Sequence, residues 1–392
     1  MSADRTGSIL PLEVDAFLEE ACRRTGLDDF GPQWFFKGMS VFFEAARNEA
    51  QWTPEGRVRR TEYFLHGLSN RLNMFDWIKR HPEILDEKVS VAGIVVGLPR
   101  TGSTMVHRLL DAGPNMTAMR MWENIFLAPM PGEGAHGLDQ RVAIGQQAMA
   151  EELRQFPQLA AMHPPVFDGA EEEILLMEQW FIGTGVESQQ WVPSFGEWHI
   201  KQNLTDAYRD LFTSLQFLQW QRLGRKNCSW VLKSPGHLVD IHSLLAVFPD
   251  AKIINTHRDP LSTIPSYASM MEMFYGMHSN AADPALIGPY WAKRWGQILS
   301  RYLDARREFP DDRFIDVQFR DVIGDKLEQV KMIFDRMGRP LDEAGVAAIE
   351  ASIAADPHAS TAKHHYKMER YGLTQELIEN EFAAYRTRFI DA

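Results

Sequence analysis

Apolar residues recur at spacings of three and four along three stretches near the start of the chain, which is the pattern of helices with one buried face. The three stripes are Leu12, Phe17, Leu18 and Ala21; Phe35, Met39, Phe42 and Phe43; and Leu65, Leu68, Leu72, Phe75 and Ile78. Pro82 ends the third helix, because proline disfavours helical backbone at the residue before it. We therefore predict a helical N-terminal extension over residues 1–88.

From residue 89 onward, short β-branched runs are separated by helical stretches. The candidate strands are residues 90–96 (SVAGIVV), 229–232 (SWVL), 252–256 (KIINT) and 314–319 (FIDVQF). The helical stretches include residues 105–111, 206–223, 237–248 and 326–337. Strands that alternate with helices predict βαβ units and a mostly parallel sheet. We expect one α/β domain over residues 89–392, with the helical extension packed on it.

The composition is that of an ordinary globular protein with an acidic surface. Of the 392 residues, 45% are hydrophobic and 24% are charged, and the net charge is −12. This balance argues against broad binding to nucleic acid or anionic membranes, so any anion site must be local. Cys22 and Cys228 are too few for a disulfide framework, and no uncharged apolar run reaches the ~18 residues of a membrane span. Since the N-terminus also lacks the pattern of a signal peptide, we expect a cytoplasmic protein.

A glycine-rich segment follows the first candidate strand and begins a helix, which is the context of a phosphate-binding loop. It reads GLPRTGST, in which Gly97 and Gly102 keep the spacing of the nucleoside triphosphate motif and Thr104 keeps its hydroxyl. Ser103 stands where that motif has a lysine for the β- and γ-phosphates, which argues against ATP or GTP hydrolysis. Arg100 offers a cation that can bind two anionic oxygens. The loop predicts a site for a shorter phosphate group, with a plain strand-to-helix turn as the alternative.

A second candidate anion site follows the strand at residues 252–256. Arg258 lies at the carboxyl end of that strand, where ligands of α/β sheets bind. Asp259 is placed to cap a helix that begins at Pro260. Ser266 lies on this helix, eight residues after Arg258. A capped helix with a surface arginine is the alternative interpretation.

Together the two segments resemble the sulfotransferases that use 3′-phosphoadenosine 5′-phosphosulfate (PAPS), in the bacterial branch with a P-R-[ST]-G-[ST]-[ST] loop. In that family the loop binds the 5′-phosphosulfate, and an arginine and a serine eight residues later bind the 3′-phosphate. The resemblance covers residues 89–389 and implies a three-layer fold like that of the P-loop NTPases, with a central, mostly parallel sheet flanked by helices. It also implies PAPS as co-substrate and 3′-phosphoadenosine 5′-phosphate (PAP) as product. The residues implied to bind them are Arg100, Thr101, Gly102, Ser103, Thr104, Arg258 and Ser266.

Sulfuryl transfer requires a base, stabilisation of the charge that develops on the leaving phosphate, and in-line reactants. Residues 231–238 (VLKSPGHL) resemble the family's K-x-P-x-H segment. The resemblance implies Lys233, with Arg100, as contacts of the leaving group and His237 as general base. Glu123 is a rival base, because a related branch uses a glutamate in roughly this region and an apolar setting would raise its pKa. We expect no metal, since no His/Cys cluster has the spacing of metal ligands.

The remaining expectations concern the acceptor and the C-terminal segment. Lys363 is implied to close over the adenosine phosphate, with a solvated basic turn as the alternative. Aromatic and methionine residues at 191–198 and 270–277, with Trp291 and Trp295, predict an apolar wall for a lipophilic alcohol or phenol (sterol-like, isoprenoid or aryl), although most such residues are core in any protein. The acidic segment 171–173 could border this wall, but its spacing assigns it no chemistry.

Two other functions stay open at this point. One is a nucleotide or small-molecule kinase on the same fold, which would need Mg²⁺ and ATP. The other is a non-catalytic PAP-binding protein. The sequence leaves the acceptor and the oligomeric state open, a homodimer included.

Overall fold

A parallel five-stranded sheet forms the centre of the structure, a computed structural model that describes residues 10–130, 132–136, 139–159, 166–355 and 367–391. The strands are β1 (Val91–Gly97), β2 (Met116–Thr117), β3 (Ser229–Lys233), β4 (Lys252–His257) and β5 (Phe314–Gln318). Their order across the sheet is β2-β3-β1-β4-β5, and each neighbouring pair is parallel. The first strand in sequence therefore lies at the centre, between β3 and β4.

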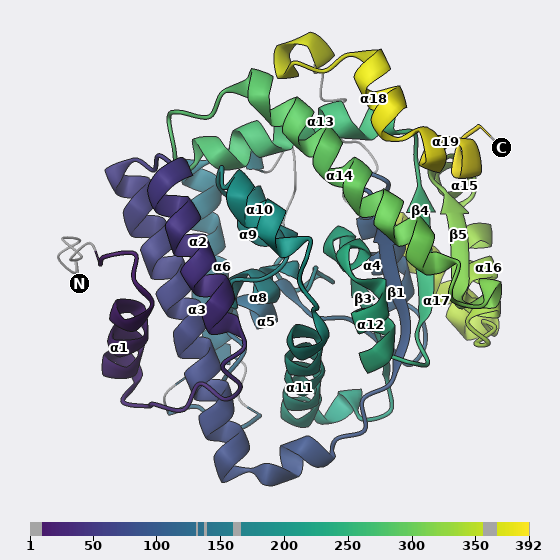
Figure 1. The fold of residues 1–392 in the computed structure, drawn as a ribbon. Helices are drawn as coiled ribbons and strands as arrows, with labels where there is room; N and C mark the ends of the chain where they lie inside the picture. Colours follow the sequence, from purple (N-terminus) through teal and green to yellow (C-terminus); the bar gives the residue numbers. More distant parts are fainter. Residues whose placement is uncertain (1–9, 131, 137–138, 160–165, 356–366, 392) are drawn as a thin grey trace.

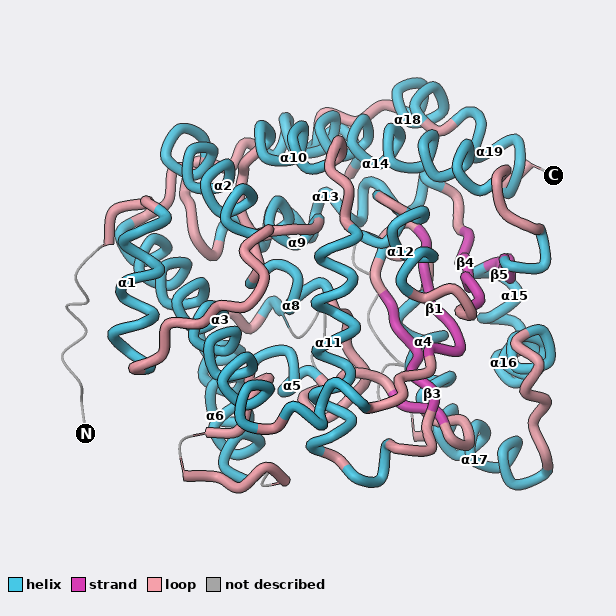
Figure 2. Tube along the Cα trace, turned by 60° about the horizontal axis from the view of Figure 1, so that its bottom comes forward, coloured by secondary structure: helices cyan, strands magenta, loops and turns pink. Residues whose placement is uncertain are grey.

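Helices cover both faces of this sheet (Figures 1 and 2). Among the described residues, the α-helices that precede α10 are α1 (Val14–Thr25), α2 (Phe35–Glu49), α3 (Pro54–Arg80), α4 (Ser103–Asp111), α5 (Met121–Ile125), α6 (Asp139–Gln155), α8 (Ile174–Gln179) and α9 (Thr184–Ser188). Those that follow are α10 (Pro193–His199), α11 (Thr205–Gln221), α12 (Ile241–Val247), α13 (Pro260–Gly276), α14 (Pro284–Arg306), α15 (Phe319–Gly324), α16 (Lys326–Arg336), α17 (Glu343–Ala354), α18 (Gln375–Glu381) and α19 (Ala383–Phe389).

Side chains alternate between two cores along each central strand, as the period of two in a β-strand requires. On one face, Val95 and Ile254 pack with apolar residues of α4, α16 and α17. On the other face, Ile94 and Ile253 join a larger core to which α11, α12 and α14 contribute. Because the strands are buried on both faces, they read in the sequence as unbroken apolar runs. The predicted three-layer α/β fold is confirmed.

The N-terminal helices share the larger core. Phe17 of α1, Phe42 of α2 and Phe64 of α3 belong to the same continuous cluster as Leu232 of the sheet. Figure 1 shows these three helices side by side at the edge of the molecule away from β5. The division of the chain at residue 88 into a helical extension and an α/β domain stays a prediction.

Some element boundaries differ from the predicted ones for local reasons. The structure has a short 3₁₀ helix over Pro235–Val239 and a separate helix α12, not one helix over residues 237–248. Asp240 divides them, because its side chain accepts a hydrogen bond from the Ser243 N–H and so starts α12. The two-residue strand β2 has no sequence signal. Phe319 begins α15 rather than ending β5.

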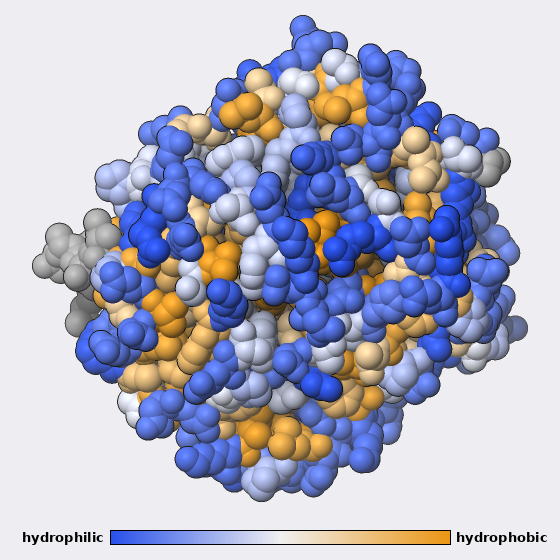
Figure 3. Space-filling model, viewed as in Figure 1, coloured by the Kyte–Doolittle hydropathy of each residue, from blue (hydrophilic) through white to orange (hydrophobic). Residues whose placement is uncertain are grey.

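The exterior combines polar side chains with small apolar patches (Figure 3). Within the described residues, no helix is both long and apolar enough to cross a membrane. Cys22 and Cys228 are both free thiols.

Candidate functional site

The carboxyl ends of three adjacent strands meet at one edge of the sheet. The central strand β1 ends at Gly97 and leads into the glycine-rich loop. On one side of it β3 ends at Lys233, and on the other side β4 ends at His257, directly before Arg258. This edge is where α/β proteins bind ligands. The topology therefore brings together three segments, at residues 97, 233 and 258, that lie far apart in the sequence.

The loop after β1 has three residues with left-handed backbone. Gly97 has φ 144°, and a Cβ atom there would lie 2.5 Å from the carbonyl oxygen of Thr256. Gly102 has φ 84° and precedes the first residue of α4. Arg100 has φ 71°, a conformation that costs a non-glycine residue roughly 1–2 kcal/mol. Strain of this kind is kept where function requires a side chain in a fixed place.

Two hydroxyl residues of the loop point into the protein. The Thr101 hydroxyl donates to the Leu98 carbonyl at 2.7 Å and forms a 2.7 Å hydrogen bond with the Thr256 hydroxyl. Ser103 is buried and begins α4. These side chains brace the loop, so its contribution to an anion would come from the N–H groups of the first turn of α4, which have no partners within the helix.

The two predicted anion sites are in direct contact. The Arg100 Nε donates to the Ser266 hydroxyl at 3.2 Å, and one guanidinium nitrogen of Arg258 donates to the Arg100 carbonyl at 3.0 Å. The Arg258 guanidinium also lies over the Phe319 ring, 4.2 Å from its centroid. Arg100, Arg258 and Ser266 are all partly exposed. The structure thus places two fixed cations and a hydroxyl at one accessible face.

Lys233 comes to the same loop from β3. Its side chain is fully buried, and its Nζ donates to the Thr104 hydroxyl at 3.2 Å and pairs with the carboxylate of Glu172. The ammonium therefore lies beside the start of α4. In a nucleoside triphosphate loop, a lysine of the loop itself occupies this region. Glu172 keeps 16% of its side chain exposed, so this ion pair borders solvent.

His237 is enclosed by two polar groups. Its Nδ1 is 3.2 Å from the Tyr208 hydroxyl, and its Nε2 is 3.5 Å from Glu173 Oε2. Glu173 also accepts the backbone N–H of Lys233 at 3.0 Å. Burial raises the pKa of Glu173, an effect that the neighbouring imidazole only partly offsets. The imidazole and this carboxyl group therefore lie next to each other in a buried environment.

Glu123 lies in a different environment from the one expected for a base. It is fully buried, and Arg225 binds both of its oxygens at 2.8 and 3.1 Å. A third hydrogen bond comes from the Arg120 backbone at 2.8 Å. Burial alone would raise the pKa of Glu123, but Arg225 and then Arg222 outweigh it, and the pKa is lowered. The expected rise is therefore wrong, and this glutamate lacks the basis on which it was a rival base.

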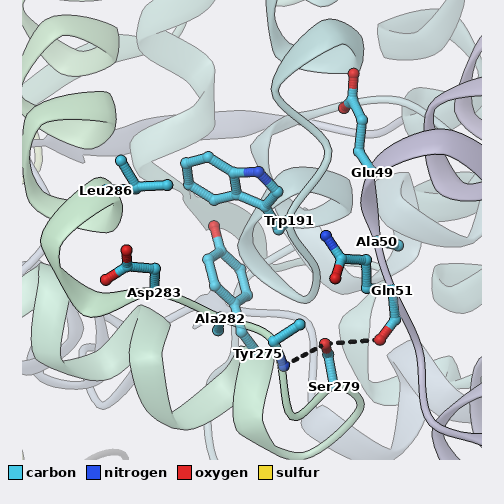
Figure 4. Close-up of a pocket in the computed structure, with 10 residues that line it drawn as sticks. Glu49, Ala50, Gln51, Trp191, Tyr275, Ser279, Ala282, Asp283 and Leu286 are labelled. Atoms are coloured by element: carbon cyan, nitrogen blue, oxygen red, sulfur yellow. Dashed lines mark hydrogen bonds between the residues drawn. The ribbon is translucent and has the colours of Figure 1, made fainter.

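The acceptor wall is only partly as expected. Trp291 and Trp295 are core residues, so their assignment to an acceptor surface is wrong. Trp191 instead lines a cavity with Tyr275 of α13, beside the loop that precedes α14, and the two rings meet there in an edge-to-face arrangement (Figure 4). Tyr275 lies near the end of α13, about 22 Å along the helix from its first residue, Pro260. Lys363 lies outside the described residues.

Among the residues that the structure describes, no group of three or more His, Cys, Asp or Glu side chains could hold a metal ion. Two arginines, one lysine, the loop amides and the His237–Glu173 pair are the groups at this site that can bind an anion or move a proton.

Comparison with known proteins shows the family. The model of the sulfotransferase family matches residues 94–343, which is more than half of the chain. The chain belongs to the sulfotransferase family. The matched residues contain the loop, Lys233, His237 and Arg258, and the predicted family is confirmed.

Two curated relatives of this chain come from mycobacteria. The omega-hydroxy-beta-dihydromenaquinone-9 sulfotransferase Stf3 of Mycobacterium tuberculosis (strain CDC 1551 / Oshkosh) is 31% identical over 175 residues, which are 43% of this chain and 41% of that protein. The Stf3 of Mycobacterium bovis matches to the same extent. The match thus spans less than half the length of these curated relatives.

Two solved sulfotransferases share the whole fold. The structure of STF9 from Mycobacterium avium superposes with a TM-score of 0.87 at 26% identity, covering 99% of this chain and 98% of that one. STF1 from Mycobacterium tuberculosis H37Rv gives a TM-score of 0.79 at 27% identity, with 95% and 98% covered. The N-terminal helices of this chain are therefore part of an architecture shared with these two structures.

The sequence analysis missed three residues of this site. Glu172 and Glu173 were noted only as part of an acidic segment, and Tyr208 was not singled out. Each meets Lys233 or His237 across at least 29 residues of sequence. An acidic run directly before the apolar start of α8 was the one available signal, and it is equally typical of an exposed helix start.

Proposed function

We propose that this protein transfers a sulfuryl group from PAPS to a hydroxyl group of a small lipophilic acceptor. The observation that carries the proposal is the convergence of Arg100, Lys233 and Arg258 at the carboxyl ends of three adjacent strands, within the segment that matches the family. A bisphosphorylated nucleotide with a sulfate needs several fixed cations and amide donors, and this edge of the sheet supplies them.

The donor would be held by the two anion segments. The loop amides from Thr101 to Thr104, with Arg100, would bind the 5′-phosphosulfate, and Arg258 with Ser266 would bind the 3′-phosphate. The hydrogen bond between the Arg100 Nε and Ser266, at 3.2 Å, supports a single continuous site rather than two separate ones. Lys363 remains part of this proposal as a contact of the adenosine phosphate.

Lys233 would stabilise the leaving group. Its Nζ lies within 3.2 Å of the Thr104 hydroxyl at the start of α4, where the bridging oxygen gains charge as the bond to sulfur breaks. Glu172 holds the ammonium in place before the donor binds. The bond that forms joins the acceptor oxygen to sulfur, and PAP leaves with the electron pair.

The acceptor proton would pass to the pair of His237 and Glu173. Histidine takes a proton near neutral pH, and the raised pKa of Glu173 makes that carboxylate a stronger base than an ordinary glutamate. Glu172 is the alternative base, because it is the more exposed carboxylate beside Lys233. Turnover of His237→Asn and Glu172→Gln distinguishes the two: the variant that loses turnover at unchanged PAP affinity marks the base.

The acceptor class rests on the relatives and on the composition of the chain. The curated relatives are named for an omega-hydroxylated dihydromenaquinone. The present chain is rich in aromatic and methionine side chains. We therefore propose an acceptor whose hydroxyl group is carried on an apolar body.

A kinase on the same fold is the second candidate, and one observation favours it: Lys233 from β3 supplies an ammonium beside the loop that lacks its own lysine. Calorimetry with PAP and ATP, each with and without Mg²⁺, tests both proposals. Tight binding of PAP in EDTA, with weak ATP binding, supports the sulfotransferase. Tight, Mg²⁺-dependent binding of ATP, with no binding of PAP, would support the kinase.

A further inference from the structure

The helix α19, near the end of the chain, contacts three consecutive residues of the turn between β4 and α13. The Tyr385 hydroxyl lies 3.0 Å from Nδ1 of His257 and also forms a hydrogen bond with the Arg258 backbone. One guanidinium nitrogen of Arg386 donates to Asp259 Oδ1 at 2.8 Å. We call these contacts of Tyr385 and Arg386 the clamp. Arg258, the residue between His257 and Asp259, is the one that the proposed function assigns to the 3′-phosphate.

His257 is fixed in a single hydrogen-bonding state. It is fully buried, and its Nε2 is 2.9 Å from Asp316 Oδ1. A carboxylate only accepts hydrogen bonds, so Nε2 carries the proton, and Nδ1 accepts from the Tyr385 hydroxyl. Burial lowers the pKa of His257 and keeps the imidazole neutral despite the carboxylate. The ring also stacks on Phe389 of α19, with centroids 4.0 Å apart at 16°.

Asp259 joins the same clamp to the start of α13. Its Oδ1 accepts the Leu261 N–H at 3.0 Å, as predicted for the cap of this helix, and the same oxygen accepts from Arg386. The Arg386 side chain is 16% exposed, so the ion pair is shielded from most of the solvent. The first turn of α13 and the end of β4 are thus held together from one side by α19.

The Arg258 side chain also contacts the Arg100 carbonyl and the Phe319 ring, neither of which belongs to α19. Its backbone is therefore fixed by α19 and its guanidinium by the loop after β1. A guanidinium binds phosphate with two parallel hydrogen bonds only when its orientation is set in advance.

We infer that α19 is a positioning element for nucleotide recognition, in which Tyr385 and Arg386 fix the turn that aims Arg258 at a 3′-phosphate. This inference rests on the proposed function. It predicts a selective defect: loosening the clamp weakens the binding of nucleotides that carry a 3′-phosphate and leaves those without one unaffected.

The test compares two nucleotides on four variants of the full-length protein. Calorimetry gives the Kd of PAP and of adenosine 5′-phosphate, which lacks the 3′-phosphate. Tyr385→Phe and Arg386→Met should each raise the Kd of PAP about three- to tenfold, which corresponds to the free energy of about one hydrogen bond. The Kd of adenosine 5′-phosphate should change less than twofold. Arg386→Lys should recover part of the loss. Arg388→Met is the matched control, because Arg388 is exposed on the same helix and contacts the Phe389 ring.

Several outcomes would overturn the inference. Unchanged Kd values for PAP in Arg386→Met and Tyr385→Phe, equal losses for both nucleotides, or an equal PAP defect in Arg388→Met would each contradict it. If Tyr385→Phe fails to fold, Arg386→Met decides, since the Arg386 side chain is only partly buried whereas Tyr385 is buried. A wild-type protein that binds the two nucleotides equally refutes the proposed 3′-phosphate site itself, and the inference falls with it.

Discussion

Replacing Lys233 with methionine removes the one ammonium that reaches the start of α4 among the described residues. The side chain is fully buried and its Nζ contacts Thr104 and Glu172, so no other cation can take its place without rearrangement. Loss of a single preorganised donor to a developing anion typically costs about 100- to 1,000-fold in kcat, which is about 3–4 kcal/mol. We expect a loss of that size in sulfuryl transfer.

The same change has a separate effect on stability. It leaves Glu172, which is 16% exposed, without its cation. Breaking a buried ion pair costs 3–5 kcal/mol, and partial exposure of the carboxylate reduces this to about 2–4 kcal/mol. The double variant Lys233→Met/Glu172→Gln removes the unpaired charge, so it should regain most of the stability while its turnover stays low.

Single-turnover transfer from labelled PAPS, with the protein in excess, separates these effects because it counts only folded, donor-bound protein. Urea unfolding of the three variants, with Glu172→Gln as the third, gives the stabilities. The reasoning is refuted if Lys233→Met transfers at the wild-type rate, or if the double variant regains turnover together with stability.

Three further predictions follow from the described contacts. Gly97→Ala should lower the free energy of unfolding by about 1–3 kcal/mol and weaken PAP binding, because the new Cβ would lie 2.5 Å from the Thr256 carbonyl oxygen. Thermal unfolding measures the stability and calorimetry the PAP affinity. Wild-type values of both would contradict the loop geometry. The pKa of Glu173 is raised in the folded protein, so the wild type loses the stabilising contribution of this carboxyl group as the pH rises through the folded-state pKa. Glu173→Gln lacks this group and should therefore gain stability relative to wild type between pH 5 and 9. A difference in urea unfolding that stays constant with pH would refute this. Glu123→Gln should cost about 3–5 kcal/mol by leaving Arg225 without its carboxylate, yet keep the wild-type rate per folded molecule; a large loss of rate at normal stability would restore Glu123 as a base.

The fold could be predicted largely because each central strand is buried on both faces and each loop at the functional edge has a local signature. Gly97, Gly102 and Asp259 adopt the roles that their residue types suggest, the first two with left-handed backbone and the third as a helix cap. These features depend on a few neighbouring residues, which is the range over which a sequence pattern carries information. The strand β2 was missed because two residues cannot display a period.

The polar interior could not be predicted in the same way. Glu173, Tyr208 and Glu123 are polar residues buried by partners far away in sequence, and nothing local distinguishes them from surface residues. The sign of the Glu123 pKa shift depended on whether Arg225 reached it. Likewise, Trp291 and Trp295 are chemically suited to a ligand surface, and only the packing of α14 against α13 assigns them to the core.

Single-turnover transfer of labelled sulfate from PAPS to a panel of acceptors tests the central claim most directly. The panel should hold an omega-hydroxylated isoprenoid, a sterol, a phenol, a sugar and a tyrosine peptide, in a buffer with EDTA. We predict that label appears on the hydroxyl group of at least one lipophilic acceptor and that Lys233→Met abolishes it. Transfer of phosphate from ATP to any of these acceptors in a parallel buffer with Mg²⁺, with no transfer from PAPS in either buffer, would contradict the account.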